Sequence, residues 1–258
     1  MNAMNDMKDK VAIVTGGGSG IGRASALLLA RRGATVVVAD RDESSATKVV
    51  REIEAAGGRA MAQACEVTDD CQLEALVDHA VQRYGRLDYA MNNAGITGAI
   101  GPLVDYEMKE ARRIIDINLV SLIASMQAEL RVMVKQGFGS IVNTCSIWGV
   151  TAGANYVAYS ASKHGVAGAT KAAALEVATS GIRVNAICPG FTETPMVMEQ
   201  GLKIQRGSAE HKAAGAGHPM DRMGQPHEMA EGAVWLFSDG ASFVTGHLLM
   251  IDGGFVAR

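Results

Sequence analysis

A glycine-rich turn between two short apolar runs constrains the fold of this chain more than any other feature. The run 11–14 is continuously apolar and mostly β-branched, which indicates a strand buried on both faces. The turn 15–22 (TGGGSGIG) follows at once, and the pattern over 23–32 predicts a helix. A second apolar run, 35–39, predicts the next buried strand and leads into Asp40. These residues therefore predict a strand–helix–strand unit with a glycine-rich first turn.

The glycines of this turn suit the binding of a pyrophosphate. Gly16, Gly20 and Gly22 let backbone N–H groups approach phosphate oxygens at a helix N-terminus, where the helix dipole favours anions. Asp40 lies twenty residues after Gly20, where a carboxylate can hold a ribose 2′-hydroxyl. The spacing is G-x-x-x-G-x-G rather than G-x-G-x-x-G, and a tight structural turn is the alternative interpretation. The flanking strands and the acid favour a dinucleotide site.

Strand and helix patterns alternate along the rest of the chain. This alternation predicts an α/β fold, a single Rossmann-type doubly wound domain whose sheet has about seven parallel strands with helices on both faces. The further predicted strands are 60–66, 87–91, 140–145, 182–187 and 247–251, and the further predicted helices are 44–56, 68–84, 105–134, 156–179 and 226–237.

Length and composition agree with one domain. With 258 residues, of which 48% are hydrophobic and 20% charged, the chain can bury a sizeable core. We expect a mobile lead-in at 1–9 and a single Rossmann-type domain over 10–258. The segment 191–224 breaks the alternation and is rich in methionine, glycine and polar residues. Because ligands of open α/β sheets bind beyond the carboxyl ends of the strands, this insertion is predicted to be a substrate loop.

Several classes of partner are disfavoured. The net charge is −3 without a long basic run, which argues against nucleic acid, and no signal peptide or membrane-spanning run is predicted. Four cysteines without C-x-x-C or zinc spacing indicate a reducing, cytoplasmic compartment. His211 and His218 are interpreted as solvated loop residues, and no catalytic metal is predicted.

Tyr159 and Lys163 form a candidate proton-transfer pair. They are four residues apart on the predicted helix 156–179 and therefore share one of its faces. A phenol has a pKa of about 10, and a neighbouring ammonium would lower it. Taken alone, the pair fits an ordinary amphipathic helix with a surface lysine better, because short motifs are weak evidence.

Together with the other motifs of the chain, the pair favours a catalytic role. These motifs resemble those of the short-chain dehydrogenase/reductase family in order and spacing. The resemblance extends from Val11 to Gly254. The motifs are Thr15-Gly16-x-x-x-Gly20-x-Gly22, Asn92-Asn93-Ala94-Gly95, Ser146, Tyr159-x-x-x-Lys163 and Pro189-Gly190.

The resemblance implies a role for each of four catalytic residues. Tyr159 would be the general acid/base, and Lys163 would lower the Tyr159 pKa and bind the nicotinamide ribose. Ser146 would hydrogen-bond the substrate oxygen. Asn118 would fix a helix bend and a water through which Lys163 relays protons. Two donors that converge on the substrate oxygen would stabilise the charge that develops on it.

The cofactor predicted from this resemblance is NAD. Asp40 would repel the 2′-phosphate of NADP, although the guanidinium of Arg41 could reach such a phosphate. Glu66-Val67 stands where family members often have Asp-Val, which weakens the expected adenine contact. The predicted cofactor-binding residues are Gly16, Ser19, Gly20, Ile21, Gly22, Asp40, Arg41, Glu66, Val67, Asn93, Ala94, Gly95, Tyr159, Lys163, Pro189, Gly190, Thr192 and Thr194.

The substrate pocket is predicted to be apolar and adaptable, which favours a hydrophobic, cyclic or aryl secondary alcohol or its ketone. Two alternatives are a 3-oxoacyl-carrier-protein reductase that uses NADPH and a nucleotide-sensing protein without catalysis. The resemblance also implies a homotetramer or homodimer. The candidate pocket residues are Ile96, Ile147, Trp148, Tyr156, Phe191, Met196 and Met198.

Overall fold

The fold is a single parallel sheet between two layers of helices. The computed structural model describes residues 6–200 and 203–258. Seven strands pair in the order β3-β2-β1-β4-β5-β6-β7, every pair parallel, which confirms the predicted fold class. The strands are β1 (Val11–Thr15), β2 (Thr35–Asp40), β3 (Arg59–Ala64), β4 (Tyr89–Asn92), β5 (Gly139–Thr144), β6 (Ile182–Pro189) and β7 (Leu248–Ile251).

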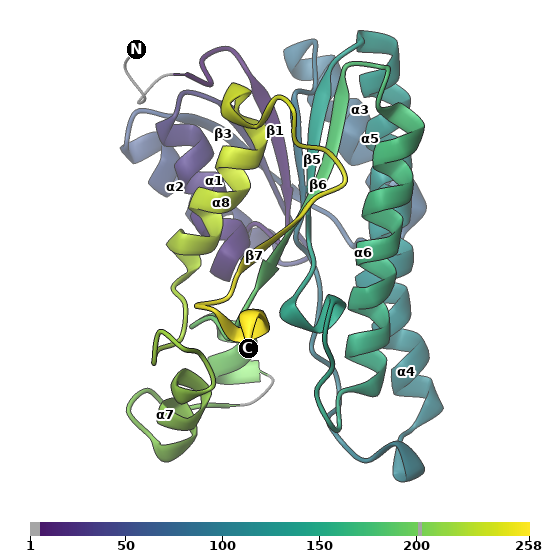
Figure 1. The fold of residues 1–258 in the computed structure, drawn as a ribbon. Helices are drawn as coiled ribbons and strands as arrows, with labels where there is room; N and C mark the ends of the chain where they lie inside the picture. Colours follow the sequence, from purple (N-terminus) through teal and green to yellow (C-terminus); the bar gives the residue numbers. More distant parts are fainter. Residues whose placement is uncertain (1–5, 201–202) are drawn as a thin grey trace.

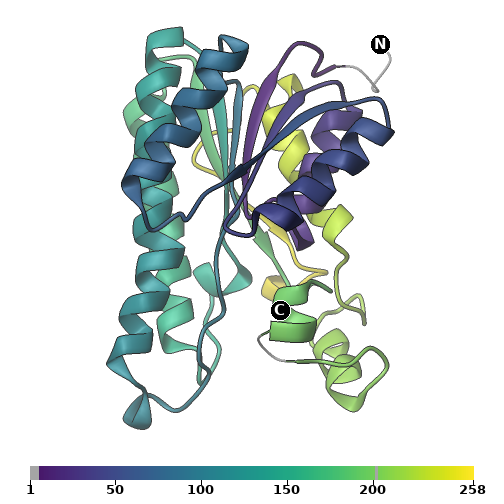
Figure 2. The ribbon, with the colours of Figure 1, turned by 180° about the vertical axis from the view of Figure 1, so that it is seen from behind.

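The helices cover both faces of this sheet (Figures 1 and 2). One apolar cluster joins the sheet to α1 (Gly20–Arg31), α2 (Glu43–Ala55) and α8 (Pro226–Phe237). The second cluster joins it to α3 (Asp70–Tyr84), α5 (Ser121–Gln136) and α6 (Val157–Val177). The remaining helices within the described residues are α4 (Met108–Ile115), α7 (Ala209–Ala216) and six short ones: η1 (Leu103–Asp105), η2 (Asp116–Val120), η3 (Ile147–Gly149), η4 (Met196–Gln200), η5 (Asp239–Ala241) and η6 (Phe255–Ala257).

The strand order reverses between β1 and β4. The chain builds outwards from β1 to β3, then returns to the other side of β1 and continues from β4 to β7. In open α/β sheets, ligands bind beyond the carboxyl ends of the strands at this switch point. The segment that carries α7 extends beyond the same ends of the strands (Figures 1 and 2).

The helix predicted over 105–134 begins only at Met108 and is not a regular α-helix throughout. The structure divides it into α4, the π-helical turn η2 and α5. The side chain of Asn118 in η2 accepts a hydrogen bond from Ile96 N (2.8 Å) and donates one to Ile96 O (2.9 Å). Apolar periodicity cannot reveal this contact, because it depends on a loop distant in sequence. Single π-helical turns of this kind are frequent at functional sites.

The composite helix Met108–Gln136 is long and apolar enough to cross a membrane, by length and composition alone. Its position argues for another role, since Ile114, Leu122, Met126 and Met133 are buried in the fold. Three of them belong to the cluster that packs against the sheet. These contacts are those of a core helix, which passes the same test of length and composition.

The packed part of the chain begins before residue 10. Residues 1–5 of the predicted lead-in lie outside the described residues. Met7, in contrast, is 1% exposed, and its backbone N–H donates to Arg32 O at 3.0 Å. The Nε of Arg32 donates to Asp6 at 2.8 Å. The predicted boundary of the lead-in at residue 9 is therefore wrong for these two positions.

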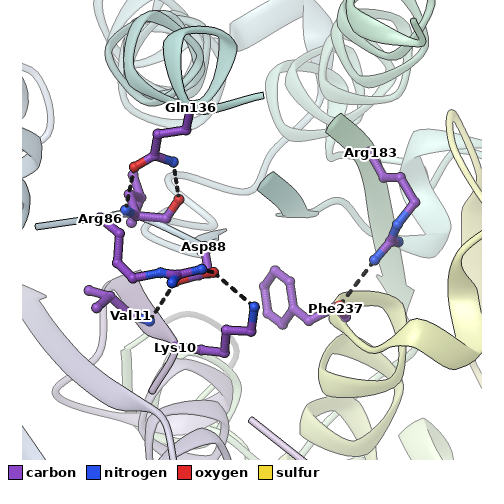
Figure 3. Close-up of polar contacts among 8 residues, drawn as sticks. Lys10, Val11, Arg86, Asp88, Gln136, Arg183 and Phe237 are labelled. Carbon is purple, nitrogen blue, oxygen red and sulfur yellow. Dashed lines mark hydrogen bonds and ion pairs between the residues drawn. The ribbon is translucent and has the colours of Figure 1, made fainter. Parts of the chain in front are cut away.

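The amino edge of the sheet is fixed by Asp88, which precedes β4 (Figure 3). Its carboxylate accepts hydrogen bonds from Val11 N (3.0 Å) and from the Nε of Arg86 (2.7 Å), and Lys10 Nζ lies 3.3 Å away. Gln136, at the end of α5, bonds both backbone groups of Leu87 beside it. These contacts hold the starts of β1 and β4 together, at the edge opposite the glycine-rich turn.

Candidate active site

A cleft of about 530 Å³ lies over the carboxyl ends of the strands. This volume is within the usual range for small-molecule sites, roughly 300–1,000 Å³. All predicted cofactor residues except Gly22 line it. Residues that the sequence analysis missed also line it, and most of them are sequence neighbours of predicted ones: Asp42, Ser45, Cys65, Ile117, Thr144, Cys145, Pro195, Val197 and Glu199.

The glycine turn fits a dinucleotide pyrophosphate. Gly16 and Gly20 have φ values of 61° and 51°, which favour glycine. Gly22 does not line the cleft, and a Cβ there would lie 2.2 Å from Gly16 O. Its role is to let the first turn of α1 pack against the loop. The side chain of Ser19 does not cap α1, so it does not occupy the N–H groups that an anion would use.

Asp40 stands at the far end of the cleft, after β2. Its carboxylate accepts hydrogen bonds from Gly18 N and Asp42 N, both at 3.0 Å. Asp42 lines the cleft as well, and hydrogen bonds from Ser45 and Ser44 hold its pKa at about 2. Two carboxylates thus face this end of the cleft, and Arg41 between them is exposed.

Glu66 lines the cleft, but its carboxylate is engaged with its own turn. Oε1 accepts hydrogen bonds from the backbone N–H of Thr68 (3.3 Å) and from the Thr68 hydroxyl (3.1 Å). The expected contact of this carboxylate with an adenine therefore competes with a local capping interaction. Val67 also lines the cleft, 8% exposed.

The three polar residues of the proposed catalytic wall meet at the middle of the cleft. Ser146 follows β5, while Tyr159 and Lys163 lie one turn apart on α6. Lys163 is 4% exposed, and its Nζ donates to Thr144 O at 2.8 Å. The Nζ lies 5.7 Å from the centroid of the Tyr159 ring. Ser146 accepts a hydrogen bond from Trp148 N at 3.2 Å.

The electrostatics of this wall differ from the sequence-based expectation. Burial raises the pKa of Tyr159 to about 12, and a hydrogen bond with Ser146 opposes this shift only in part. Burial also lowers the pKa of Lys163. The net pKa of Tyr159 in the protein alone is therefore raised, because desolvation of the phenolate dominates. The lowering of this pKa by Lys163, whose ammonium bonds Thr144 O, stays a prediction.

Asn118 lies behind the cleft rather than in its wall. Besides the two bonds to Ile96, its Nδ2 donates to Ser162 Oγ at 3.2 Å. A Cβ at Gly95 would lie 3.1 Å from Asn118 Oδ1, so the loop 93–96 packs closely against this amide. Through these hydrogen bonds, Asn118 in η2 connects that loop to α6. Its role in a proton relay stays a prediction.

The predicted pocket residues separate into three groups. Ile96 and Met196 line the cleft. Trp148 packs against Tyr156, Phe191 and Tyr159, with ring centroids 4.1, 5.9 and 6.3 Å apart respectively. Five of the seven predicted residues do not line the cleft: the side chain of Ile147 is buried at 3% exposure, and the lining also leaves out Trp148, Tyr156, Phe191 and Met198.

The interpretation of His211 and His218 as solvated residues is wrong. His211 lies on α7, and its Nε2 is 3.0 Å from the Glu193 carboxylate. His218 is 3% exposed and is bonded on both ring nitrogens. Within residues 6–200 and 203–258, no group of three His, Cys, Asp or Glu side chains is placed to hold a metal ion.

The fold and the cleft define a class of protein: a dinucleotide-binding oxidoreductase with a serine–tyrosine–lysine wall. A family model described as enoyl-(acyl carrier protein) reductase matches residues 16–256. The cyclohexanol dehydrogenase of Acinetobacter sp. (strain SE19) is 42% identical over 254 residues, 98% of each chain. The cis-4-hydroxycyclohexanecarboxylate dehydrogenase of Sinomonas cyclohexanicum is 43% identical, over 96% of this chain and 97% of that one.

A solved structure of NAD⁺-bound xylitol dehydrogenase superposes with a TM-score of 0.91 at 33% identity, over 97% of this chain and 100% of that one. With these matches, the chain belongs to the short-chain dehydrogenase/reductase family. It is an oxidoreductase of alcohol and ketone groups.

Proposed function

We propose that this chain is an NAD(H)-dependent dehydrogenase that interconverts a cyclic secondary alcohol and its ketone. The observation that carries the proposal is the convergence of Ser146, Tyr159 and Lys163 on the cleft that the glycine turn also lines. The aromatic and aliphatic side chains beside Tyr159 support a hydrophobic ring as substrate. The ring alcohols in the names of the two relatives agree with it.

The residues around the cleft would hold the cofactor along its length. Gly16 and Gly20 would bind the pyrophosphate and Asp40 the adenosine ribose, while Pro189 and Thr192 would contact the nicotinamide. When bound, the nicotinamide supplies or takes up the hydride. The protein's part is to orient it towards Ser146 and Tyr159 and to exclude water.

Tyr159 would move the proton at the substrate oxygen. With its pKa raised to about 12, the phenol keeps its proton near neutral pH and can donate it to the oxygen of a ketone undergoing reduction. Ser146 would give a second hydrogen bond to the same oxygen. In the direction of oxidation, Tyr159 must accept the proton, and the nearby positive charge of Lys163 favours the phenolate that does so.

The charge around Asp40 supports NAD over NADP. Asp40 and Asp42 both line the end of the cleft where a 2′-phosphate would lie, and that phosphate would be repelled. Arg41 is exposed and lies between them, so it would have to overcome two carboxylates to hold the phosphate. The alternative weighed from the sequence, a reductase of carrier-bound 3-oxoacyl groups, would be expected to use NADPH.

An assay of substrates and cofactors tests the proposal. The purified protein is mixed with cyclohexanol and either NAD or NADP, and the absorbance of the reduced nicotinamide is followed. We expect turnover of cyclohexanol with a kcat/KM for NAD at least about tenfold above that for NADP. Faster turnover of a 3-oxoacyl thioester with NADPH than of any cyclic ketone with NADH would reject the proposal in favour of the carrier-protein alternative.

The predicted homotetramer also stays a proposal. Val120 and Ile123 lie on the composite helix Met108–Gln136 and Leu175 lies on α6, with 50%, 47% and 81% of their surface exposed respectively. Apolar side chains on two neighbouring helices suit contact with a second copy of the chain. Light scattering of the protein in solution would measure the number of copies, and a monomer would refute the assembly.

A further inference from the structure

We propose that His218 is a positioning residue for the substrate side of the cleft. Its imidazole accepts a hydrogen bond from the backbone of Phe191 and packs against the Phe191 ring, which in turn packs against Trp148 beside Tyr159. The proposal rests on the proposed function for the kind of substrate, a ring alcohol. The contacts of His218 themselves do not depend on that assignment.

Both ring nitrogens of His218 have defined partners. Nδ1 lies 2.6 Å from the carbonyl oxygen of Asp252, and the backbone N–H of Phe191 points to Nε2 at 3.3 Å. A carbonyl can only accept a hydrogen bond, so Nδ1 must carry a proton and donate it. Nε2 then has the free lone pair that accepts from Phe191. One neutral tautomer satisfies both contacts, and the side chain is 3% exposed.

The turn behind His218 is held by hydrogen bonds to Asp252. The Asp252 carboxylate accepts hydrogen bonds from the backbone N–H groups of Gly254 (3.0 Å) and Val256 (2.8 Å). The ring of Phe255 lies 5.3 Å from the imidazole, centroid to centroid. The imidazole therefore connects the C-terminal turn, which closes the fold, to the start of the substrate loop.

The imidazole also packs directly on the segment proposed to hold the nicotinamide. A Cβ at Gly190 would lie 2.4 Å from His218 Cε1, so no side chain fits at position 190. The backbone N–H of Gly190 donates to Ile251 O at 3.0 Å. Gly190 and Phe191 are thus held in the same small assembly, which includes the strand β7 and the imidazole.

An edge-to-face chain of rings continues from His218 to Tyr159. The imidazole and the Phe191 ring are 5.9 Å apart, and Phe191 and Trp148 are also 5.9 Å apart. Trp148 then contacts Tyr159 at 6.3 Å and Tyr156 at 4.1 Å. Such contacts fix the orientation of rings as well as burying area. A displacement of Phe191 would therefore loosen the wall beside the proposed acid/base.

This arrangement makes His218 a positioning residue rather than a catalytic one. The cleft that contains Ser146, Tyr159 and Lys163 is not lined by His218. His218 instead lines a separate cavity of about 100 Å³ with Phe191 and Asp252. Since both ring nitrogens already have partners, His218 would affect the reaction only by fixing the position of Phe191.

Two conservative substitutions at His218 each keep one of its two hydrogen bonds and remove the other. In His218→Gln, the side-chain oxygen can reach the position of Nε2 and accept from Phe191 N. In His218→Asn, the shorter amide can reach only the position of Nδ1 and bond Asp252 O, which leaves Phe191 N without its acceptor. The exposed His227, on α8, offers a control, His227→Gln.

We expect His218→Asn to raise the KM for cyclohexanol about tenfold and to change kcat less than about threefold, because uniform binding of the ring is lost. His218→Gln should restore KM to within about threefold of the wild type, and His227→Gln should leave both constants unchanged. Equal KM values for all four proteins would overturn the proposal. Equal impairment of the Gln and Asn variants would also overturn it, since only a structural role would remain.

A fluorescence measurement gives a readout without any turnover. The chain has two tryptophans, so Trp235→Phe leaves Trp148 as the sole emitter. In that background, acrylamide should quench Trp148 more strongly in His218→Asn than in His218→Gln or the parent. If the protein oxidises no alcohol, the proposed function fails while this comparison still decides the role of His218.

A second substitution guards against poor folding of the His218 variants. Phe191→Leu removes the ring but leaves His218 and its partners in place. It should raise the KM for cyclohexanol by a factor similar to that of His218→Asn and should likewise expose Trp148 to acrylamide. A Phe191→Leu variant with unchanged KM and unchanged quenching would refute the proposal independently.

Discussion

A charged side chain is buried at each end of the strands, Asp88 at the amino edge of the sheet and Lys163 at the carboxyl edge. The two charges have different partners. At the amino edge, the Asp88 side chain is 3% exposed and has two cations beside it, Arg86 and Lys10, as well as Val11 N–H (Figure 3). At the carboxyl edge, Lys163 is 4% exposed and its ammonium donates to the neutral carbonyl of Thr144. Among the described residues, no carboxylate lies within ion-pairing distance of Lys163.

We propose that this difference distinguishes a structural charge, Asp88, from a functional one, Lys163. A buried charge is costly unless it is paired, and at Asp88 the pairing is complete. At Lys163 the cost is only partly compensated, and burial lowers the pKa of the ammonium. The field of an unpaired cation remains available to a neighbour, here Tyr159 and whatever negative charge enters the cleft. Three substitutions test this comparison, and they follow in order of decreasing effect.

The largest effect is expected at the carboxyl edge. Tyr159→Phe removes the hydroxyl that would transfer the proton while keeping the ring that packs against Trp148. We expect kcat for cyclohexanol to fall by about a thousandfold, in the range typical of general acid/base groups. Steady-state kinetics measure this fall.

The matched control for that variant is Tyr156→Phe. Tyr156 contacts the same Trp148 ring but is not proposed to transfer a proton. Its substitution should change kcat less than about threefold, and both variants should keep the melting temperature of the wild type within a few degrees. A Tyr159→Phe variant with wild-type kcat would remove Tyr159 from the mechanism.

The second largest effect is expected for a substitution of Asp88 at the amino edge, which should change the stability of the fold but not the activity. Asp88→Asn leaves Arg86 and Lys10 without their carboxylate and should lower the free energy of unfolding by about 3 kcal/mol. Urea denaturation measures this change, and kcat for cyclohexanol should not change. An exposed pair gives the control: Arg59→Gln, whose ion pair with Asp9 spans 3.7 Å at 66% and 73% exposure, should cost less than about 0.5 kcal/mol. A loss of kcat in Asp88→Asn would break the distinction between the two edges.

Local sequence patterns were sufficient for the sheet and for most of the cleft. The β-branched runs at 11–14 and 35–39 form β1 and β2, and the glycine turn between them opens α1 as predicted. Gly16 and Asp40 reach the same cleft because the order of strand, turn and helix fixes where each strand ends. Such features depend on residues that are close in the chain.

Features that depend on distant contacts were not predictable in this way. The π-helical turn at Asn118 depends on Ile96, and the burial of His218 depends on Asp252, 34 residues away. The raised pKa of Tyr159 reflects desolvation by the completed fold, whereas spacing revealed only that Lys163 would be near. Neither periodicity nor motif spacing contains this information.

Glu129 on α5 is a third buried ionisable group and gives the smallest expected effect. It is 2% exposed, and its partner is neutral: Asn92 Nδ2 donates to it at 3.1 Å. Burial raises its pKa from an ordinary value of 4.5 to about 8, and the hydrogen bond from Asn92 opposes this only in part. Unlike Asp88, it has no cation within ion-pairing distance in the part of the chain that the structure describes. Unlike Lys163, it does not line the cleft, so it should be buried as the neutral acid.

The sign of its pH dependence follows from the raised pKa. Below pH 4.5 the carboxyl is protonated in both the folded and the unfolded chain, and its contribution to stability is fully present. Between pH 4.5 and about 8 the folded chain holds more protons, so stability falls as the pH rises, and the contribution is lost above about pH 8.

Glu129→Gln cannot ionise and should remove this part of the pH dependence. From pH 6.5 to pH 8.5 the wild type should therefore lose on the order of 2 kcal/mol more free energy of unfolding than the variant. Urea denaturation of both proteins at the two pH values measures the difference, which cancels the titration of all other groups. Equal slopes would show that Glu129 is already ionised in the fold, and that this buried charge is tolerated without a cation, as Lys163 is without a carboxylate.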